Sequence, residues 1–152
     1  MRPAIPERSC SQQTLTRTSL RISEGQYYEA HQQLRVIASR YIKSTPPSYG
    51  SAIDILFNGA QLLLNAGQGG SGGDLCLYLM EVYNKAELNL DAKIKGQLLT
   101  LLRAFPSGEP TRKRFVNEMI TYSSSNSEYP AGDPDLHHVA GQLYADGTLT
   151  SC

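Results

Sequence analysis

The chain has 152 residues, no tryptophan, and 14 basic and 14 acidic side chains that cancel to a formal net charge of zero. This length is typical of one domain, which can bury about two thirds of the surface of its unfolded chain. The first residues contain no apolar run suited to a secretory signal. The run from Leu75 to Met80 is far shorter than the roughly 20 residues that span a bilayer. The three cysteines form no metal or disulfide pattern. The composition therefore predicts a soluble cytosolic protein with reduced thiols.

Two helices are predicted first, after a disordered segment at residues 1–10. The first is expected at residues 11–24, and Gly25 then allows the chain to reverse within a residue or two. The second covers residues 25–43, where apolar side chains recur on one face and the opposite face becomes cationic towards its end. Pro46 and Pro47 cannot continue it. The pair predicts a tight hairpin with a basic outer side.

The third and fourth helices flank a glycine-rich segment. The third starts near Ser48 with a strong helical period, and residues 67–73 then include five glycines, two of them at the spacing of a phosphate-binding loop. Gly73 and Asp74 follow where that loop needs a lysine and then a serine or threonine, and the Asp74 carboxylate would repel phosphate. We therefore expect the glycines to form a wide turn and Asp74 to cap a fourth helix at residues 74–87. This helix is apolar on most sides, which predicts that neighbouring helices enclose it.

Three further helices complete the predicted fold. Asp91 is expected to cap the fifth, Pro110 to lie in the first turn of the sixth, and Asp133 with Pro134 to start the seventh. Residues 123–132 are polar, and a mobile loop is expected at residues 123–127. The seventh helix should stop at Gly147, and residues 148–152 should form a stub.

No strand is predicted, so the fold class is all-α. The expected architecture is an α-solenoid at residues 11–147, in which about seven helices stack as antiparallel hairpins into a right-handed superhelix similar to tetratricopeptide arrays. The seventh helix has no hairpin mate, and stacked repeats usually end in a unit with a polar outer face. The chain therefore reads as the front portion of a longer solenoid.

Charge is unevenly distributed along the chain. Residues 1–50 contain seven basic and three acidic side chains, whereas residues 51–152 contain seven basic and eleven acidic ones. The surplus of positive charge indicates a surface that meets something negative, with ordinary solvated charge as the alternative. An acidic protein fits better than nucleic acid, because no aromatic side chains that could stack on bases are interleaved with the basic ones.

Catalytic and metal-binding patterns are weak. Residues 133–138 include two aspartates and two histidines, but adjacent histidines on a helix point about 100° apart and no second cluster completes a metal site. His31 has no nucleophile at a recognisable spacing, and Cys76 lies among apolar residues that disfavour a thiolate. The sequence therefore predicts no enzyme, no metal and no cofactor.

Several segments, in order along residues 14–147, form a more specific pattern. Gly25 to Lys43 is the first, residues 58–60, 68–75 and 79–83 follow, and Gly-Asp-Pro-Asp-Leu-His at residues 132–137 is the last. Together they resemble the Golgi-to-ER traffic protein 4 family, the helical scaffold of the pathway for guided entry of tail-anchored proteins.

This resemblance implies an adaptor rather than a catalyst. In that family the N-terminal half docks on the cytosolic ATPase that carries tail-anchored membrane proteins, favouring its nucleotide-bound closed form. The C-terminal half, expected to be absent from this chain, holds a ubiquitin-like partner. The first two helices and the start of the fourth supply the surface that faces the ATPase. The matching candidates are Tyr28, His31, Arg35, Arg40, Lys43 and Asp74, with Arg17 and Arg21 as weaker ones.

The expected function is thus a non-catalytic cytosolic scaffold that docks on the targeting ATPase and promotes insertion of tail-anchored proteins into the ER membrane, without entering the membrane itself. The alternative is a helical-repeat module that binds nucleic acid or another polyanion through the same basic helices. A metal-dependent hydrolase is the third hypothesis, and zinc or iron bound to the purified protein would support it.

Overall fold

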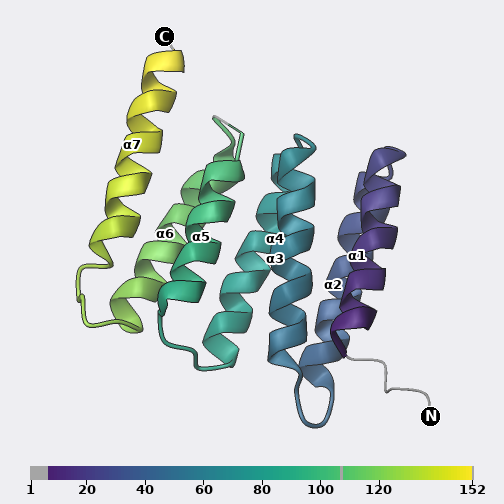
Figure 1. Ribbon diagram of the computed structural model, residues 1–152. Helices are drawn as coiled ribbons and strands as arrows, with labels where there is room; N and C mark the ends of the chain where they lie inside the picture. The colour runs from purple at the N-terminus through teal and green to yellow at the C-terminus, as the bar shows by residue number, and fades with distance from the viewer. Residues whose placement is uncertain (1–6, 107, 152) are drawn as a thin grey trace, which may run out of the picture.

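A computed structural model describes residues 7–106 and 108–151, and it describes side chains within residues 12–106 and 108–145. The described residues form seven α-helices and no strand, which confirms the predicted all-α solenoid. Figure 1 shows the helices as pairs that follow one another in a row, with α1 and α2 at one end and α7 at the other. The helices are α1 (Glu7–Ser23), α2 (Tyr27–Lys43), α3 (Tyr49–Asn65), α4 (Gly69–Lys85), α5 (Ala92–Ala104), α6 (Pro110–Ser125) and α7 (Pro134–Ser151).

The hydrophobic core extends along the row of helices and is not confined to one centre. Helix α3 packs against α4, α2, α1 and α5, while α4 also contacts α6 and α2, and α7 contacts α5 and α6. Apolar side chains from α2 to α7 form one continuous buried cluster. Helix α4 contributes many of its members, as its apolar sequence predicts. Among the described residues, no helix combines the length and apolarity that crossing a membrane requires.

Several predicted helix ends are confirmed. Gly25 has φ 79°, and the Gln26 amide donates to the Arg21 carbonyl (2.8 Å), so the chain reverses as expected between α1 and α2. The Asp91 side chain accepts from the Ile94 amide at the start of α5. Pro110 is the first residue of α6. Asp133 Oδ1 accepts from two amides in the first turn of α7.

The predicted start of α4 is wrong. The helix begins at Gly69, five residues earlier than expected, so Asp74 lies in its second turn and does not cap it. The glycines serve close packing: a Cβ at Gly72 would lie 2.7 Å from Leu64 Cγ, and one at Gly73 would lie 2.8 Å from Thr111 Cβ. Only a glycine backbone lets α4 approach α3 and α6 so closely.

Other helix ends differ by several residues. Helix α1 begins at Glu7, within the segment predicted to be disordered, and residues 1–6 lie outside the described residues. Helix α6 continues to Ser125, and serine hydroxyls in its last turn donate to carbonyls of the preceding turn. Helix α7 continues past Gly147 into the segment predicted to be a stub, since an interior glycine costs a helix only about 1 kcal/mol; Cys152 is not described.

Candidate partner-binding surface

The rotation of α2 about its axis decides which of its side chains are available. Ala30, Leu34 and Ala38 are fully buried. Leu34 packs directly over Gly59 of α3, where a Cβ atom would overlap the leucine side chain. This contact fixes the apolar face of α2 on α3. His31 and Arg35, one turn apart, consequently lie at the edge of that face, next to α4.

A single carboxylate connects α2 to α4. His31 Nε2 donates to Asp74 Oδ2 (2.6 Å), and Arg35 Nη1 donates to the same oxygen (2.7 Å). The Arg35 guanidinium also lies over the Tyr78 ring, with 4.6 Å between Cζ and the ring centroid. We call these four residues the α2/α4 cluster. The His31 side chain is 12 % exposed, whereas Arg35 and Asp74 are 38 % and 43 % exposed. Water therefore screens the ion pair, which stabilises the fold only modestly.

A shallow groove of about 600 Å³ lies beside this cluster. We call it the α2/α4 groove. It is lined by Arg35, Val36, Arg40 and Lys43 of α2 and by Tyr78 of α4, among others. Arg40 and Lys43 are exposed, and neither forms an ion pair with any residue that the structure describes. Two unpaired cations and a partly fixed guanidinium therefore face a concave surface.

The six main candidate residues from the sequence lie in one region. His31, Arg35 and Asp74 touch one another, and Arg40 and Lys43 continue along α2. Tyr28, in the first turn of α2, is 68 % exposed and available for contact. The weaker candidates on α1 are also solvent-accessible, but neither lines the groove; they are Arg17, which is exposed, and Arg21, which is half-buried. That any of these residues binds a partner stays a prediction.

Two residues of this surface were missed in the sequence. Val36 is 48 % exposed in the groove, and Tyr78 supports the Arg35 guanidinium. Tyr78 lies four residues after Asp74, a spacing that puts both side chains on one helix face. That spacing was the available signal, and the apolar character of α4 obscured it. Val36 lies two residues from the buried Leu34 and Ala38, and the rotation of α2 about its axis turns it to solvent.

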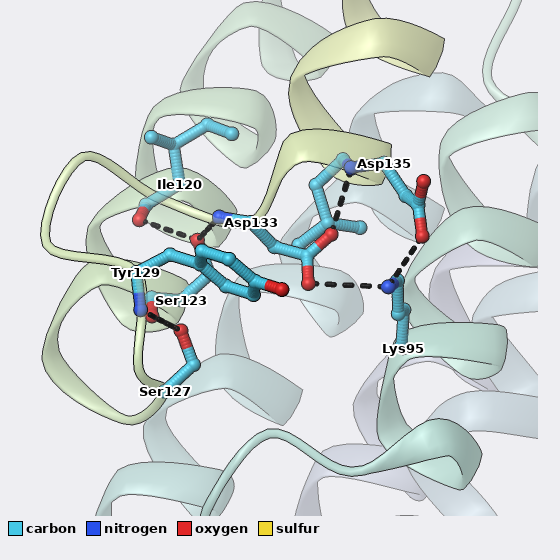
Figure 2. Close-up of polar contacts among 8 residues, drawn as sticks. Lys95, Ile120, Ser123, Ser127, Tyr129, Asp133 and Asp135 are labelled. Atoms are coloured by element: carbon cyan, nitrogen blue, oxygen red, sulfur yellow. Dashed lines mark hydrogen bonds and ion pairs between the residues drawn. The ribbon is translucent and has the colours of Figure 1, made fainter.

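A second polar cluster joins α5 to the start of α7 (Figure 2). Lys95 Nζ lies 2.6 Å from Asp135 Oδ2 and 3.1 Å from Asp133 Oδ2. Ser123 Oγ donates to the Ile120 carbonyl and accepts from the Asp133 amide (3.0 Å). The hydrogen bond with Asp135 raises the pKa of Lys95, and the same bond lowers the pKa of Asp135. The cluster therefore fixes how the α6–α7 loop enters α7.

Three of the four aspartates and histidines at residues 133–138 have structural partners. The two carboxylates point towards Lys95, and His137 Nε2 donates to the Ala131 carbonyl (2.7 Å). In the part of the chain that the structure describes, no group of three or more histidine, cysteine, aspartate or glutamate side chains is arranged to hold a metal ion. Burial raises the pKa of the Cys76 thiol, which disfavours the reactive thiolate.

Comparison with known proteins identifies the family. The family model described as Golgi to ER traffic protein 4 matches residues 47–151, which is more than half of the chain and includes α3 to α7 in full. The chain belongs to this family. The matched residues contain Asp74 and Tyr78, and helix α2 precedes them.

Named relatives support this assignment. Golgi to ER traffic protein 4 of Aspergillus fumigatus is 50 % identical over 146 residues, which cover 88 % of this chain and 42 % of the relative. The Schizosaccharomyces pombe protein of that name is 35 % identical, covering 77 % of this chain and 37 % of the relative. The Homo sapiens homolog is 30 % identical, covering 78 % and 35 %. The chain thus spans less than half the length of these relatives.

A solved structure has the same fold. The crystal structure of C. therm. Get4 is similar to this chain with a TM-score of 0.84 and 45 % identity. The similarity covers 90 % of this chain and 44 % of that one. The two chains therefore share one fold over most of the length of this chain.

Proposed function

We propose that the chain is a non-catalytic cytosolic adaptor of the pathway that targets tail-anchored proteins. In this proposal its N-terminal helices dock on the targeting ATPase and thereby promote post-translational insertion of tail-anchored proteins into the ER membrane. The observation that carries the proposal is the α2/α4 groove, in which Arg40 and Lys43 are exposed and unpaired beside an arginine that Asp74 holds in place. Membership of the Golgi to ER traffic protein 4 family supplies the pathway.

The arrangement supports docking on an acidic protein surface. Arg35 is already held by Asp74 and Tyr78, so it loses less side-chain freedom on binding than a free arginine does. Arg40 and Lys43 attract an acidic partner at long range and raise the rate of encounter. If the closed form of the ATPase offers more acidic surface than the open form, binding shifts its population towards closure by the difference in affinity.

The ubiquitin-like partner belongs to a different part of this proposal. The chain spans 42 % of the Aspergillus fumigatus relative, and the family resemblance assigns the ubiquitin-like protein to the C-terminal half of the full-length proteins. We accordingly assign no site for it to the described helices. Binding of the ATPase by this chain is expected to be independent of that partner.

Charge reversal in the groove tests the proposal. The double variant Arg40→Glu with Lys43→Glu should lower affinity for the ATPase at least tenfold at low salt, because two attractive contacts become repulsive. The matched control reverses Lys113 and Arg114, which are exposed on α6 and give the same change in net charge. Affinity should be measured at about 0.05 M and about 0.5 M salt, where screening lengths differ severalfold. Unchanged affinity of the groove variant at both salt concentrations would refute the interface.

The alternative function is binding of a polyanion such as nucleic acid. The observation that favours it is the concentration of Arg35, Arg40 and Lys43 in one groove. A nucleic-acid binder should be retained on a polyanion column at about 0.15 M salt and should release with a steep salt dependence. Elution of the wild type well below that concentration would exclude this alternative.

A further inference from the structure

We infer that the α2/α4 groove takes an apolar side chain from an acidic protein segment, with Val36 as its main contact and Tyr78 as its floor. This inference rests on the proposed function, because it names the chemistry of the partner at the same surface. It adds a residue, Val36, that the sequence pattern did not single out, and it separates a protein partner from a polyanion at this surface.

The exposure of Val36 is the first observation. Its side chain is 48 % exposed, while Leu34 and Ala38, two residues away on either side, are fully buried in the core. Val36 therefore contributes little to the core of the solenoid. A single exposed valine is ordinary on a protein surface. This one lies in a concave groove, where a partner side chain can cover it from several directions.

The floor of the groove is the second observation. Tyr78 is half-buried, and the Arg35 guanidinium lies 4.6 Å from its ring centroid. Asp74 Oδ2 holds the same guanidinium at 2.7 Å, so this wall of the groove is preformed. An apolar side chain that enters beside Val36 meets an aromatic edge and the carbon stems of long basic side chains, which bury apolar surface well.

The distribution of charge is the third observation. The described residues that line the groove include three cations and no carboxylate. A small apolar centre surrounded by charged residues is the usual anatomy of a protein interface. A nucleic-acid backbone satisfies the cations but offers no aliphatic group to cover Val36. An acidic protein segment that carries one apolar side chain satisfies both, and we take it as the occupant.

The variant Val36→Ser tests the apolar contact without changing charge. Affinity for the targeting ATPase should fall roughly 5- to 30-fold, because the variant loses the burial of an aliphatic side chain. The slope of log Kd against log salt should stay that of the wild type, because no ion pair is removed. Val36→Met should restore most of the affinity. Thermal stability should change little, since valine and serine have similar helix propensities and the side chain lies outside the core.

The matched control is Tyr129→Ser in the α6–α7 loop. Tyr129 is 41 % exposed and lies outside the groove, so its loss should leave affinity for the ATPase unchanged. If Val36→Ser binds the ATPase as tightly as the wild type does, the inference is overturned and the proposed function stands. Equal losses in Val36→Ser and Tyr129→Ser would overturn it as well, because the groove would then have no special role.

A second probe separates failure of the inference from failure of the proposed function. If the wild type does not bind the ATPase, the proposed function fails. The groove is then titrated, with NMR detection, with an acidic peptide that contains one leucine and with the same peptide carrying serine instead. Binding that depends on the leucine and is lost in Val36→Ser supports the inference. Equal binding of both peptides, or binding of a single-stranded oligonucleotide instead of either, overturns it.

Discussion

The glycine-rich start of α4 allows a matched comparison of two glycine-to-alanine substitutions. Gly73 and Gly96 are each the fifth residue of their helices, α4 and α5. A Cβ at Gly96 meets nothing within 4 Å, so Gly96→Ala should gain the helix propensity of alanine and stabilise the protein by about 0.5–1 kcal/mol. At Gly73 the same methyl group overlaps Thr111 and comes within 3.1 Å of Phe105 Cε1.

The cost at Gly73 follows from what has to move. Thr111 lies in the first turn of α6, and its hydroxyl donates to Glu109 Oε1 (3.1 Å), so rotating it away breaks that bond. Phe105 is nearly buried and packs on Phe115, which leaves it little room to yield. Overpacking of this kind costs about 1–3 kcal/mol, which exceeds the propensity gain. Gly73→Ala should therefore be less stable than the wild type by up to about 2 kcal/mol.

Urea and thermal unfolding followed by circular dichroism measure both variants. In a domain of this size 1 kcal/mol shifts Tm by about 2–4 °C, so the two variants should move in opposite directions by several degrees in total. The m-value should stay constant, because neither substitution changes the surface exposed on unfolding. If Gly73→Ala were as stable as Gly96→Ala, the close approach of α4 to α6 would be excluded.

Three further predictions concern polar groups. A double-mutant cycle of Asp74→Ala with Arg35→Ala should give a coupling free energy of about 0.5–1 kcal/mol in urea unfolding, because the pair is partly exposed; strict additivity would contradict the contact. Glu87 has φ 55° after α4, so Glu87→Gly should raise Tm by relieving about 1 kcal/mol of left-handed strain, and no rise would contradict that conformation. The lowered pKa of Asp135 predicts that its bond to Lys95 stabilises the fold above the usual carboxyl range and that this contribution disappears as pH falls through the lowered pKa. Asp135→Asn should accordingly be less stable than the wild type at about pH 7 and equal to it at about pH 2, and a constant difference would refute the pairing.

The helices could be predicted because their signals are local. Apolar residues at helical spacing mark the buried faces. Asp91 and Asp133 mark helix starts through hydrogen bonds that they accept within one turn, and Pro110 marks one because its fixed φ suits the first helical position. The start of α4 could not be predicted in this way. Five glycines in seven residues indicate a turn by propensity, and the reason for a helix there lies in Leu64 and Thr111, which only the folded chain brings close.

The candidate site, too, could be predicted from the sequence only in part. The cationic side of α2 follows from its periodicity, so Arg40 and Lys43 could be recognised as exposed. The bonds from His31 and Arg35 to Asp74 join residues separated by 43 and 39 positions, and no spacing rule within one helix predicts them. The family resemblance placed these residues on one surface without showing that they touch.

The glycines of α4 explain why Asp74 reaches α2. Gly72 lets α4 lie against Leu64 of α3, and Leu34 of α2 lies against Gly59 of that same helix. Helix α3 thus holds α2 and α4 at close range on either side, which brings the Asp74 carboxylate within hydrogen-bonding distance of Arg35. Any substitution that moves α4 outward also lengthens that bond and frees the guanidinium. The glycine-rich segment therefore acts on the proposed docking surface through helix spacing, although its glycines do not line the groove.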